Sequence, residues 1–384
     1  FTIGSASSGV VDVGEVLKVA EQVTGNDDQA WYEGFRALAE RIESAATASA
    51  GAGHTVSARQ GYLRASAYYA AAMDGLVSEP DSPHLQPTFS LHRKCWNAFA
   101  KLCDPALEHV RIPFAAGDLP GYFVRADHSG SKRPTLIITN GSDGAITSVW
   151  DMALAAKDRG YHVLLYDGPG QQSMLFEHNT RFRADWEVVV TAVVDHLMAR
   201  PDVDADRLAI YGISQAGYWV PRALAFEHRV AAGILDPGVV DVSASWTAEL
   251  PPPLMAALTG GDKAVFKEAV NQAIAESPGL AKTWWFRSRP YGSGDPYDVY
   301  SQVIQYHLRD VASKVVTPLF IADPEGEQFW PEQSEQLASL VSGPVELCRF
   351  TAAEGADMHC EPMARKLFQQ RAFDWLDQTL GLTS

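Results

Sequence analysis

A serine hydroxyl between small residues marks the first stretch that could do chemistry, Gly212-Ile213-Ser214-Gln215-Ala216. The apolar run from Leu208 to Tyr211 before it indicates a buried strand, and the segment after it, ending near His228, has a helical pattern. A sharp turn between a strand and a helix folds the backbone back on itself, so it needs small residues two positions before and after the serine. Such a turn exposes the hydroxyl and points the following backbone N–H groups at the same space. We therefore take Ser214 as the candidate nucleophile.

A serine needs a base within hydrogen-bond reach, and the base needs a carboxylate that orients it. In hydrolases built on parallel sheets the chain order is nucleophile, acid, histidine. His359 is the last histidine of the chain, and it lies in a loop between the last predicted strand and the last predicted helix. We predict that His359 is the base, and we expect His228 and His307 to be surface or packing residues.

Two carboxylates compete for the role of the acid, and both follow the predicted strand from Pro318 to Ala322. Asp323 stands at the end of the strand, where it could simply cap the turn. Glu327 lies deeper in the loop, nearer the usual offset of this acid. We favour Glu327 and keep Asp323 as the alternative.

The negative oxygen that forms during acyl transfer needs two backbone N–H donors, and losing one typically costs about 3 kcal/mol of transition-state stabilisation. The first donor should be Gln215, the residue after the nucleophile. The second should come from the loop after the predicted strand from Leu136 to Thr139, which reads Asn140-Gly141-Ser142-Asp143-Gly144. We choose Ser142, although an ordinary glycine-rich turn would have a similar sequence.

The elements that must position these residues alternate between short apolar strands and amphipathic helices. Strands are predicted at 136–139, 162–166, 208–211, 231–235, 318–322 and 345–350, and helices at 147–159, 183–199, 331–340 and 362–380. A hairpin from Val110 to Val124 precedes them. This alternation predicts an α/β fold with a mostly parallel sheet that is covered on both faces. Pro221 lies inside the helix after Ser214, where we expect a kink that packing under the sheet edge makes tolerable.

Two helical regions flank this alternation. Residues 1–105 have helical periodicity, and residues 239–312 combine helical stretches with many aromatic residues and no convincing buried strand. We read the first as a helical N-terminal region that contributes to a cap and the second as an inserted helical cap. Residues 106–238 and 313–384 then form the two parts of the core. We expect Trp284, Trp285 and Tyr218 to line the substrate site.

Composition narrows the class of partner. A net charge of −16 argues against a nucleic-acid partner, and 46% apolar residues suffice for a sizeable core. No apolar run reaches 18 residues, so we expect no membrane span. The four cysteines show no Cys-x-x-Cys spacing and read as buried thiols in a reducing compartment. We expect a small-molecule substrate, no membrane partner and a cytoplasmic location, and we leave a homodimer open.

Four motifs together carry a resemblance to a known family: Asn140-Gly141-Ser142-Asp143, Asp167-Gly168-Pro169-Gly170-Gln171, Gly212-Ile213-Ser214-Gln215-Ala216-Gly217 and Gly355-Ala356-Asp357-Met358-His359. The chain resembles the α/β-hydrolases related to 2,6-dihydroxypseudooxynicotine hydrolase and to the fungal pigment hydrolases that shorten polyketides. The resemblance implies the α/β-hydrolase fold, with Ser214, Glu327 and His359 as the triad. It also implies hydrolysis of a carbon–carbon bond beside a ketone.

The resemblance also implies a role for Asp143, because some members of the family carry an assisting acid in the oxyanion loop. The sequence departs from the family pattern in two places. Glu327 stands where the acid is usually an aspartate, and Asp143 is shorter than the glutamate of the nicotine-pathway enzyme. A carboxylate that only caps the turn remains an equal reading of Asp143.

These observations predict a serine hydrolase that acts on a bulky, aromatic or polyketide-like carbonyl compound, without a metal or an organic cofactor. We expect carbon–carbon hydrolysis of the retro-Claisen type. The alternative is a carboxylesterase or lactonase that acts on an aromatic ester. A peptidase, or a ligand-binding module without catalysis, is also compatible with the fold.

Overall fold

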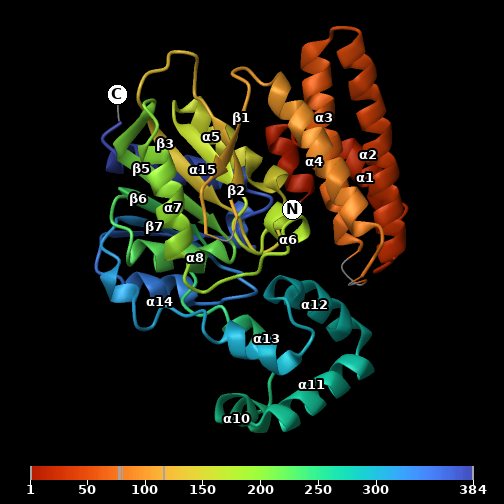
Figure 1. Cartoon of the computed structure of the whole chain (residues 1–384), viewed down its shortest axis with the longest axis vertical. Coiled ribbons are helices and arrows are strands. Elements are labelled where there is room, and N and C mark those ends of the chain that lie inside the picture. The colour runs from red at the N-terminus through yellow and green to blue at the C-terminus, as the bar shows by residue number, and fades with distance from the viewer. Residues whose placement is uncertain (1, 77–78, 80, 116, 383–384) are drawn as a thin grey trace.

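An eight-stranded sheet lies at the centre of the computed structural model, which describes residues 2–76, 79, 81–115 and 117–382 (Figure 1). The strands are β1 (Glu108–Ile112), β2 (Leu119–Val124), β3 (Arg133–Thr139), β4 (His162–Tyr166), β5 (Val203–Ile213), β6 (Ala232–Asp236), β7 (Leu319–Pro324) and β8 (Val345–Phe350). Their order across the sheet is β1-β2-β4-β3-β5-β6-β7-β8. The predicted hairpin, β1 with β2, is antiparallel, as is β2 with β4, and the other neighbours are parallel. The predicted fold class is confirmed.

Both faces of the sheet are covered, because the central strands are apolar at consecutive positions. Ile138 and Leu165 pack on the side of α5 (Trp150–Asp158) and α15 (Arg365–Thr379). Ile137 and Leu164 pack on the opposite side. The helices of that side are α7 (Glu187–Met198), α8 (Ala216–Leu224) and α14 (Gln333–Leu340).

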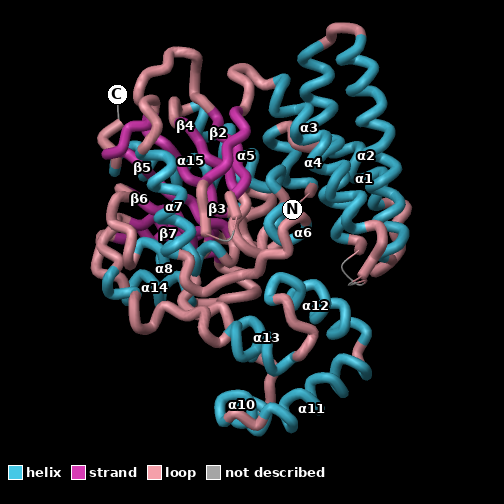
Figure 2. The backbone as a smooth tube through the Cα atoms, in the orientation of Figure 1, coloured by secondary structure: helices cyan, strands magenta, loops and turns pink. Residues whose placement is uncertain are grey.

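The N-terminal region forms a separate group of helices beside the sheet (Figure 2). These helices are α1 (Val13–Ala20), α2 (Asp28–Gly51), α3 (Thr55–Asp74) and α4 (Leu85–Leu102). A Cβ on Gly61 of α3 would lie 2.7 Å from the Cβ of Ala46 on α2, so this glycine permits their close approach. Trp96 of α4 joins the group to the core through edge-on contacts with Trp150 and Tyr122.

A second group of helices lies between β6 and β7 in the sequence and below the sheet in Figure 1. It comprises α9 (Ala244–Thr247), α10 (Pro252–Gly260), α11 (Lys263–Glu276), α12 (Pro278–Ser288) and α13 (Pro296–Val303). Residues 239–312 are all described, and the β pairing among them is one bridge between Asp241 and His307. Among the described residues, no helix is long and apolar enough to cross a bilayer.

Several helix bounds differ from those predicted. The helix expected at 183–199 begins at Glu187, and the helix expected to reach His228 ends at Leu224. Beyond Leu224, the carboxylate of Glu227 accepts the backbone N–H of Arg229 at 3.0 Å, and this local bond competes with a further helical turn. The final helix begins at Arg365 instead of Pro362.

Pro221 lies inside α8, and the helix continues past it. Proline has no N–H to donate, so the carbonyl of Gly217, four residues earlier, loses its helical partner. The N–H of Val239 donates to this carbonyl at 3.2 Å. A bond from outside the helix therefore satisfies the group that the proline leaves unpaired.

Candidate active site

Ser214 occupies a strained turn between β5 and α8. Its φ is +56°, a left-handed value that a residue other than glycine adopts at a cost of about 1–3 kcal/mol. Its N–H donates to the carbonyl of Asp236 at 2.6 Å, and its carbonyl accepts from the N–H of Gly217 at 2.8 Å. A Cβ on Gly212 would meet the carbonyl oxygen of Ala216 at 2.6 Å, which accounts for the small residue there. The turn therefore has the geometry of a nucleophile elbow.

Three side chains from distant parts of the sequence meet at this turn. Nε2 of His359 lies 2.9 Å from Oγ of Ser214, and Nδ1 of His359 lies 2.7 Å from Oε2 of Glu327. The second oxygen of Glu327 accepts the backbone N–H groups of Phe329 at 2.8 Å and Trp330 at 3.2 Å. The ring of Phe329 stands edge-on to the imidazole, with centroids 4.7 Å apart. The carboxylate, the imidazole and the hydroxyl thus form one continuous hydrogen-bonded chain.

Asp323, the alternative acid, lies elsewhere. It is the next-to-last residue of β7 and forms an ion pair with Arg349 of the neighbouring strand β8. The chain must run on to Glu327 before a carboxylate reaches His359. Of the two acids that the sequence left open, the structure brings Glu327 to the histidine.

The loop after β3 lies against the nucleophile. A Cβ on Gly141 would be 2.9 Å from the Cβ of Ser214, so only glycine permits this approach without a shift. Asn140 stabilises the loop through bonds within it: its side chain accepts the N–H of Gly141 at 2.8 Å and donates to the carbonyl of Gly144 at 2.7 Å. Gln171, which is not part of this loop, also stabilises it, because its side-chain amide donates to the carbonyls of Asn140 at 2.6 Å and Gly141 at 2.9 Å.

The two predicted oxyanion donors both line the cavity that contains Ser214. In the described part of the chain, the backbone N–H groups of Ser142 and Gln215 donate to no acceptor. The hydroxyl of Ser142 donates to the carboxylate of Asp143 at 3.1 Å. Burial raises the pKa of Asp143, whereas the bond from Ser142 and the charge of Arg287 act in the opposite direction.

The cavity has a volume of about 500 Å³, and its walls come in part from α3, from the helix α6 (Gln172–Phe176) and from α12. Figure 1 shows that the N-terminal helices, α6 and α12 approach one another. Its walls are largely aromatic and aliphatic. The aromatic residues that line it are Phe176, Phe182, Trp246, Phe286, Tyr291, Phe329 and Trp330. The N-terminal helix α3 adds Ala67, Ala70, Ala71, Met73 and Asp74. The cavity can hold a bulky, mostly apolar molecule against Ser214.

The three residues predicted to line the site do not line this cavity. On α12, Thr283, Phe286 and Arg287 face it, and this three- and four-residue spacing turns Trp284 and Trp285 away. Trp284 stacks on Tyr300 inside the group of helices between β6 and β7. Tyr218 is fully buried and donates to the carbonyl of Ala184 at 2.9 Å. The many aromatic residues in 239–312 correctly indicated a segment that lines the cavity. The rotation of each helix about its axis decided which of the rings face the cavity.

A network of buried charged side chains lies next to the site, and no pattern in the sequence predicts it. Arg365 donates to Oδ2 of Asp236 at 2.8 Å, to Oδ2 of Asp151 at 3.1 Å and to the carbonyl of Cys360 at 2.9 Å. It therefore joins the strand end that holds the Ser214 N–H to the loop that carries His359. Burial raises the pKa of the neighbouring Glu361 well above its usual value, and the charge of Asp236 adds to the effect.

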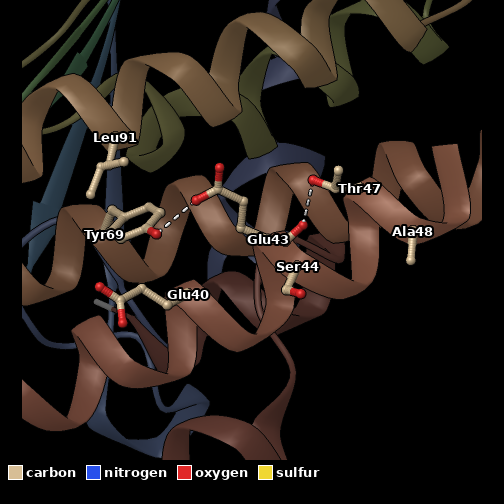
Figure 3. Close-up of a pocket in the computed structure, with 7 residues that line it drawn as sticks. All are labelled: Glu40, Glu43, Ser44, Thr47, Ala48, Tyr69 and Leu91. Carbon is tan, nitrogen blue, oxygen red and sulfur yellow. Dashed lines mark hydrogen bonds between the residues drawn. The ribbon is translucent and has the colours of Figure 1, made fainter. Parts of the chain in front are cut away.

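A second hollow lies on the surface of the N-terminal helices, away from Ser214 (Figure 3). Its lining residues are Glu40, Glu43, Ser44, Thr47, Ala48, Tyr69 and Leu91. The carboxylate of Glu43 is already engaged, because it accepts from Tyr69 at 2.7 Å and from Lys94 at 2.6 Å. These described lining residues include no histidine that could activate a nucleophile and no cysteine that could act as one. The hollow is therefore not the candidate active site.

No metal centre is evident in the part of the chain that the structure describes. No group of three or more His, Cys, Asp or Glu side chains lies there in an arrangement that could hold an ion.

Comparison with known proteins finds relatives along nearly the whole chain. Residues 147–271 match the prolyl oligopeptidase family. Hydrolase acrC of Aspergillus aculeatus is 30% identical over 406 residues, covering 98% of this chain and 94% of the relative. Hydrolase LUC6 of Fusarium sp is 28% identical, covering 99% and 95%. The 20-hydroxy-prefusarin hydrolase FUS2 of Gibberella moniliformis is 28% identical, covering 97% and 93%.

Solved structures share the fold. The crystal structure of 2,6-dihydroxy-pseudo-oxynicotine hydrolase has a TM-score of 0.77 at 19% identity, and the likeness covers 98% of this chain and 95% of that one. Wild-type AbyA5 has a TM-score of 0.65 at 16% identity, again covering 98% and 95%. At these identities the likeness concerns the fold, including the N-terminal helices that lie outside the sheet.

Proposed function

The chain belongs to the α/β-hydrolase family of its fungal relatives, and from this premise we propose that it is a serine hydrolase whose triad is Ser214, His359 and Glu327. The observation that carries the proposal is the imidazole of His359, which lies 2.9 Å from the serine hydroxyl and 2.7 Å from the carboxylate. A carboxylate at Nδ1 holds the proton on that nitrogen and leaves Nε2 free to accept a proton from the serine.

In the first step, Nε2 of His359 takes the proton of Ser214 while Oγ attacks the substrate carbonyl. The carbonyl oxygen becomes an oxyanion, which the N–H groups of Gln215 and Ser142 stabilise. When the tetrahedral intermediate collapses, the imidazolium gives its proton to the leaving group. Water then repeats the cycle on the acyl-enzyme, with His359 again as base, and releases an acid and the free serine.

We favour carbon–carbon hydrolysis beside a ketone. In that reaction Ser214 attacks the ketone, the bond to the neighbouring carbon breaks, and its electron pair leaves as an enolate that takes the proton from His359. The resemblance to hydrolases of ketonic substrates supports this choice, and so does the aromatic cavity of about 500 Å³. FUS2 is named for a prefusarin and the structural neighbour for a pseudo-oxynicotine.

Hydrolysis of an aromatic ester or lactone is the alternative, because it uses the same nucleophile and differs only in the leaving group. The match to the prolyl oligopeptidase family includes Ser214 but ends before Glu327 and His359. It therefore supports the nucleophile turn more than peptidase activity. We also propose a reducing, cytoplasmic setting, which the four free cysteines support.

A fluorophosphonate probe tests the nucleophile, because it labels only an activated serine. Wild-type protein should be labelled, and Ser214→Ala should not. Ser148→Ala is the matched control, since Ser148 lines the same cavity but its hydroxyl donates to the carbonyl of Ala145 at 2.6 Å. Equal labelling of wild type and Ser214→Ala would end the proposal.

The choice of bond is tested with the wild-type enzyme on 1-phenylbutane-1,3-dione, phenyl butyrate and a short peptide anilide. Turnover of the diketone supports carbon–carbon hydrolysis, and turnover of the ester alone supports the alternative. Cleavage of the anilide alone would refute both readings.

A further inference from the structure

The cavity has a carboxylate on its N-terminal wall that the triad and the oxyanion donors do not use. Asp74 is the last residue of α3, and it lines the same cavity as Ser214 and His359. Its neighbours on that wall, Ala71 and Met73, are small or apolar. A region far from the nucleophile in the sequence thus places one acidic group in a largely apolar wall.

Nothing in the described part of the chain engages this carboxylate. No described side chain or backbone N–H donates a hydrogen bond to Asp74, and no described cation pairs with it. The side chain exposes surface, and that surface belongs to the wall of the cavity. Because this surface faces the cavity, a molecule bound there can reach the carboxyl group of Asp74.

The electrostatic surroundings favour the protonated acid. The enclosing cavity walls desolvate the carboxylate, and together with the charge of Asp143 they raise the pKa of Asp74 to about 7, although the positive charge of the N-terminal amino group acts in the opposite direction. The backbone carbonyl groups at the C-terminal end of α3 carry a partial negative charge, which also disfavours the ionised form of Asp74. Near neutral pH, Asp74 therefore exists in both forms, and it can donate a hydrogen bond or accept one.

The remaining charged groups of the cavity lie on other walls. Arg287 on α12 donates to the carbonyl of Ser245 at 3.0 Å and to its hydroxyl at 2.7 Å, and it stacks over Trp246. Arg289 and His359 also line the cavity. The hydroxyl of Ser142 already engages Asp143. Asp74 is thus the acidic group left for a ligand.

We propose that Asp74 is a specificity-determining residue that hydrogen-bonds a hydroxyl or enol group on the ring portion of the substrate. A hydroxyl both donates and accepts, which matches a carboxyl group that can do either, while the apolar wall packs against the ring. The N-terminal helices then take part in selecting the substrate. This inference rests on the proposed function, because it concerns the occupant of the same cavity.

Binding of two ring ketones tests the inference without any turnover. We would titrate the enzyme at pH 7 with 3,5-dihydroxyacetophenone and with acetophenone, using calorimetry. The wild type should bind the dihydroxy compound at least tenfold more tightly, because a site built to bond a hydroxyl penalises the ligand that lacks it. Asp74→Ala and Asp74→Leu should each reduce the preference to about twofold or less, while Asp74→Asn, which keeps a donor and an acceptor, should retain most of it.

Asp158→Ala is the matched control, because Asp158 is an exposed aspartate at the end of a helix, as Asp74 is, but lies outside the cavity lining. Its preference should equal that of the wild type. A preference that survives both Asp74→Ala and Asp74→Leu would overturn the inference. So would a wild type with no preference, or one that binds neither ketone up to the solubility limit. Failure of the proposed function would instead appear as equal fluorophosphonate labelling of wild type and Ser214→Ala, which this binding assay does not involve.

Discussion

Replacing Glu327 by glutamine should stop catalysis while leaving the fold in place, and the hydrogen bonds of the carboxylate show why. One oxygen of Glu327 accepts two backbone N–H groups, from Phe329 and Trp330. A glutamine must place its carbonyl oxygen next to these two N–H groups, because an NH₂ group in that position would put donors against donors. The NH₂ group is then directed at Nδ1 of His359, 2.7 Å away in the wild type.

This arrangement forces the wrong tautomer on the imidazole. Nδ1 of His359 must accept from the new amide, so the ring proton moves to Nε2, which lies 2.9 Å from Oγ of Ser214. A protonated Nε2 cannot take the proton of the serine. The corresponding tautomer error in a serine protease lowers kcat by about 10⁴, which is about 5 kcal/mol at 1.36 kcal/mol per tenfold. The free energy of unfolding should fall by only about 1.5–3 kcal/mol, the scale of one hydrogen bond to a charged group.

The assay is the rate of ester hydrolysis at saturating substrate, together with the rate of fluorophosphonate labelling and a urea unfolding curve. Asp323→Asn is the matched control, because Asp323 lies near the end of the strand that precedes Glu327 but pairs with Arg349. Its kcat should stay within about twofold of the wild type, because Asp323 pairs with Arg349 and Glu327 remains the partner of His359. A Glu327→Gln enzyme that keeps a tenth of its kcat, or a control that loses as much activity, would refute the reasoning.

Three further perturbations have expected outcomes. Arg365→Met should lower the free energy of unfolding in urea by about 3–5 kcal/mol, because it leaves buried carboxylates without their cation; a loss below 1 kcal/mol would contradict this. Gly141→Ala should cut kcat by about 10²-fold, because its Cβ would lie 2.9 Å from the Cβ of Ser214 and displace it. Gly279→Ala, on α12 with nothing within 4 Å, is its control and should keep full activity. His92 is buried, and burial lowers its pKa from 6.5 to about 3. The folded state therefore binds fewer protons than the unfolded state below pH 6.5, so stability is complete above that pH and falls by about 1.4 kcal/mol per pH unit as the pH drops towards 3. His92→Gln should flatten that slope in urea unfolding curves recorded between pH 7 and pH 5, and an unchanged slope would count against it.

Features that depend on near neighbours in the chain were accessible from the sequence. The alternation of apolar strands and amphipathic helices predicted the mostly parallel sheet, because side-chain periodicity follows directly from backbone geometry. The small residues around Ser214 predicted a tight turn, and the structure shows a φ of +56° there. Helix ends were predicted less well, because local bonds such as that from the Arg229 N–H to Glu227 decide them.

Features that depend on meetings between distant segments were decided by the tertiary structure. Asp323 and Glu327 are four residues apart, and only the path of the loop and the competition from Arg349 determined which of them lies beside His359. The rotation of α12 likewise turned Phe286, and not Trp284, towards the cavity. Asp74 had no sequence signal at all, since an aspartate at the end of a helix is common and only packing placed it in the wall of the cavity that contains Ser214. Local patterns determine which elements form, whereas the direction of a side chain depends on how whole elements pack, and that is a property of the complete chain.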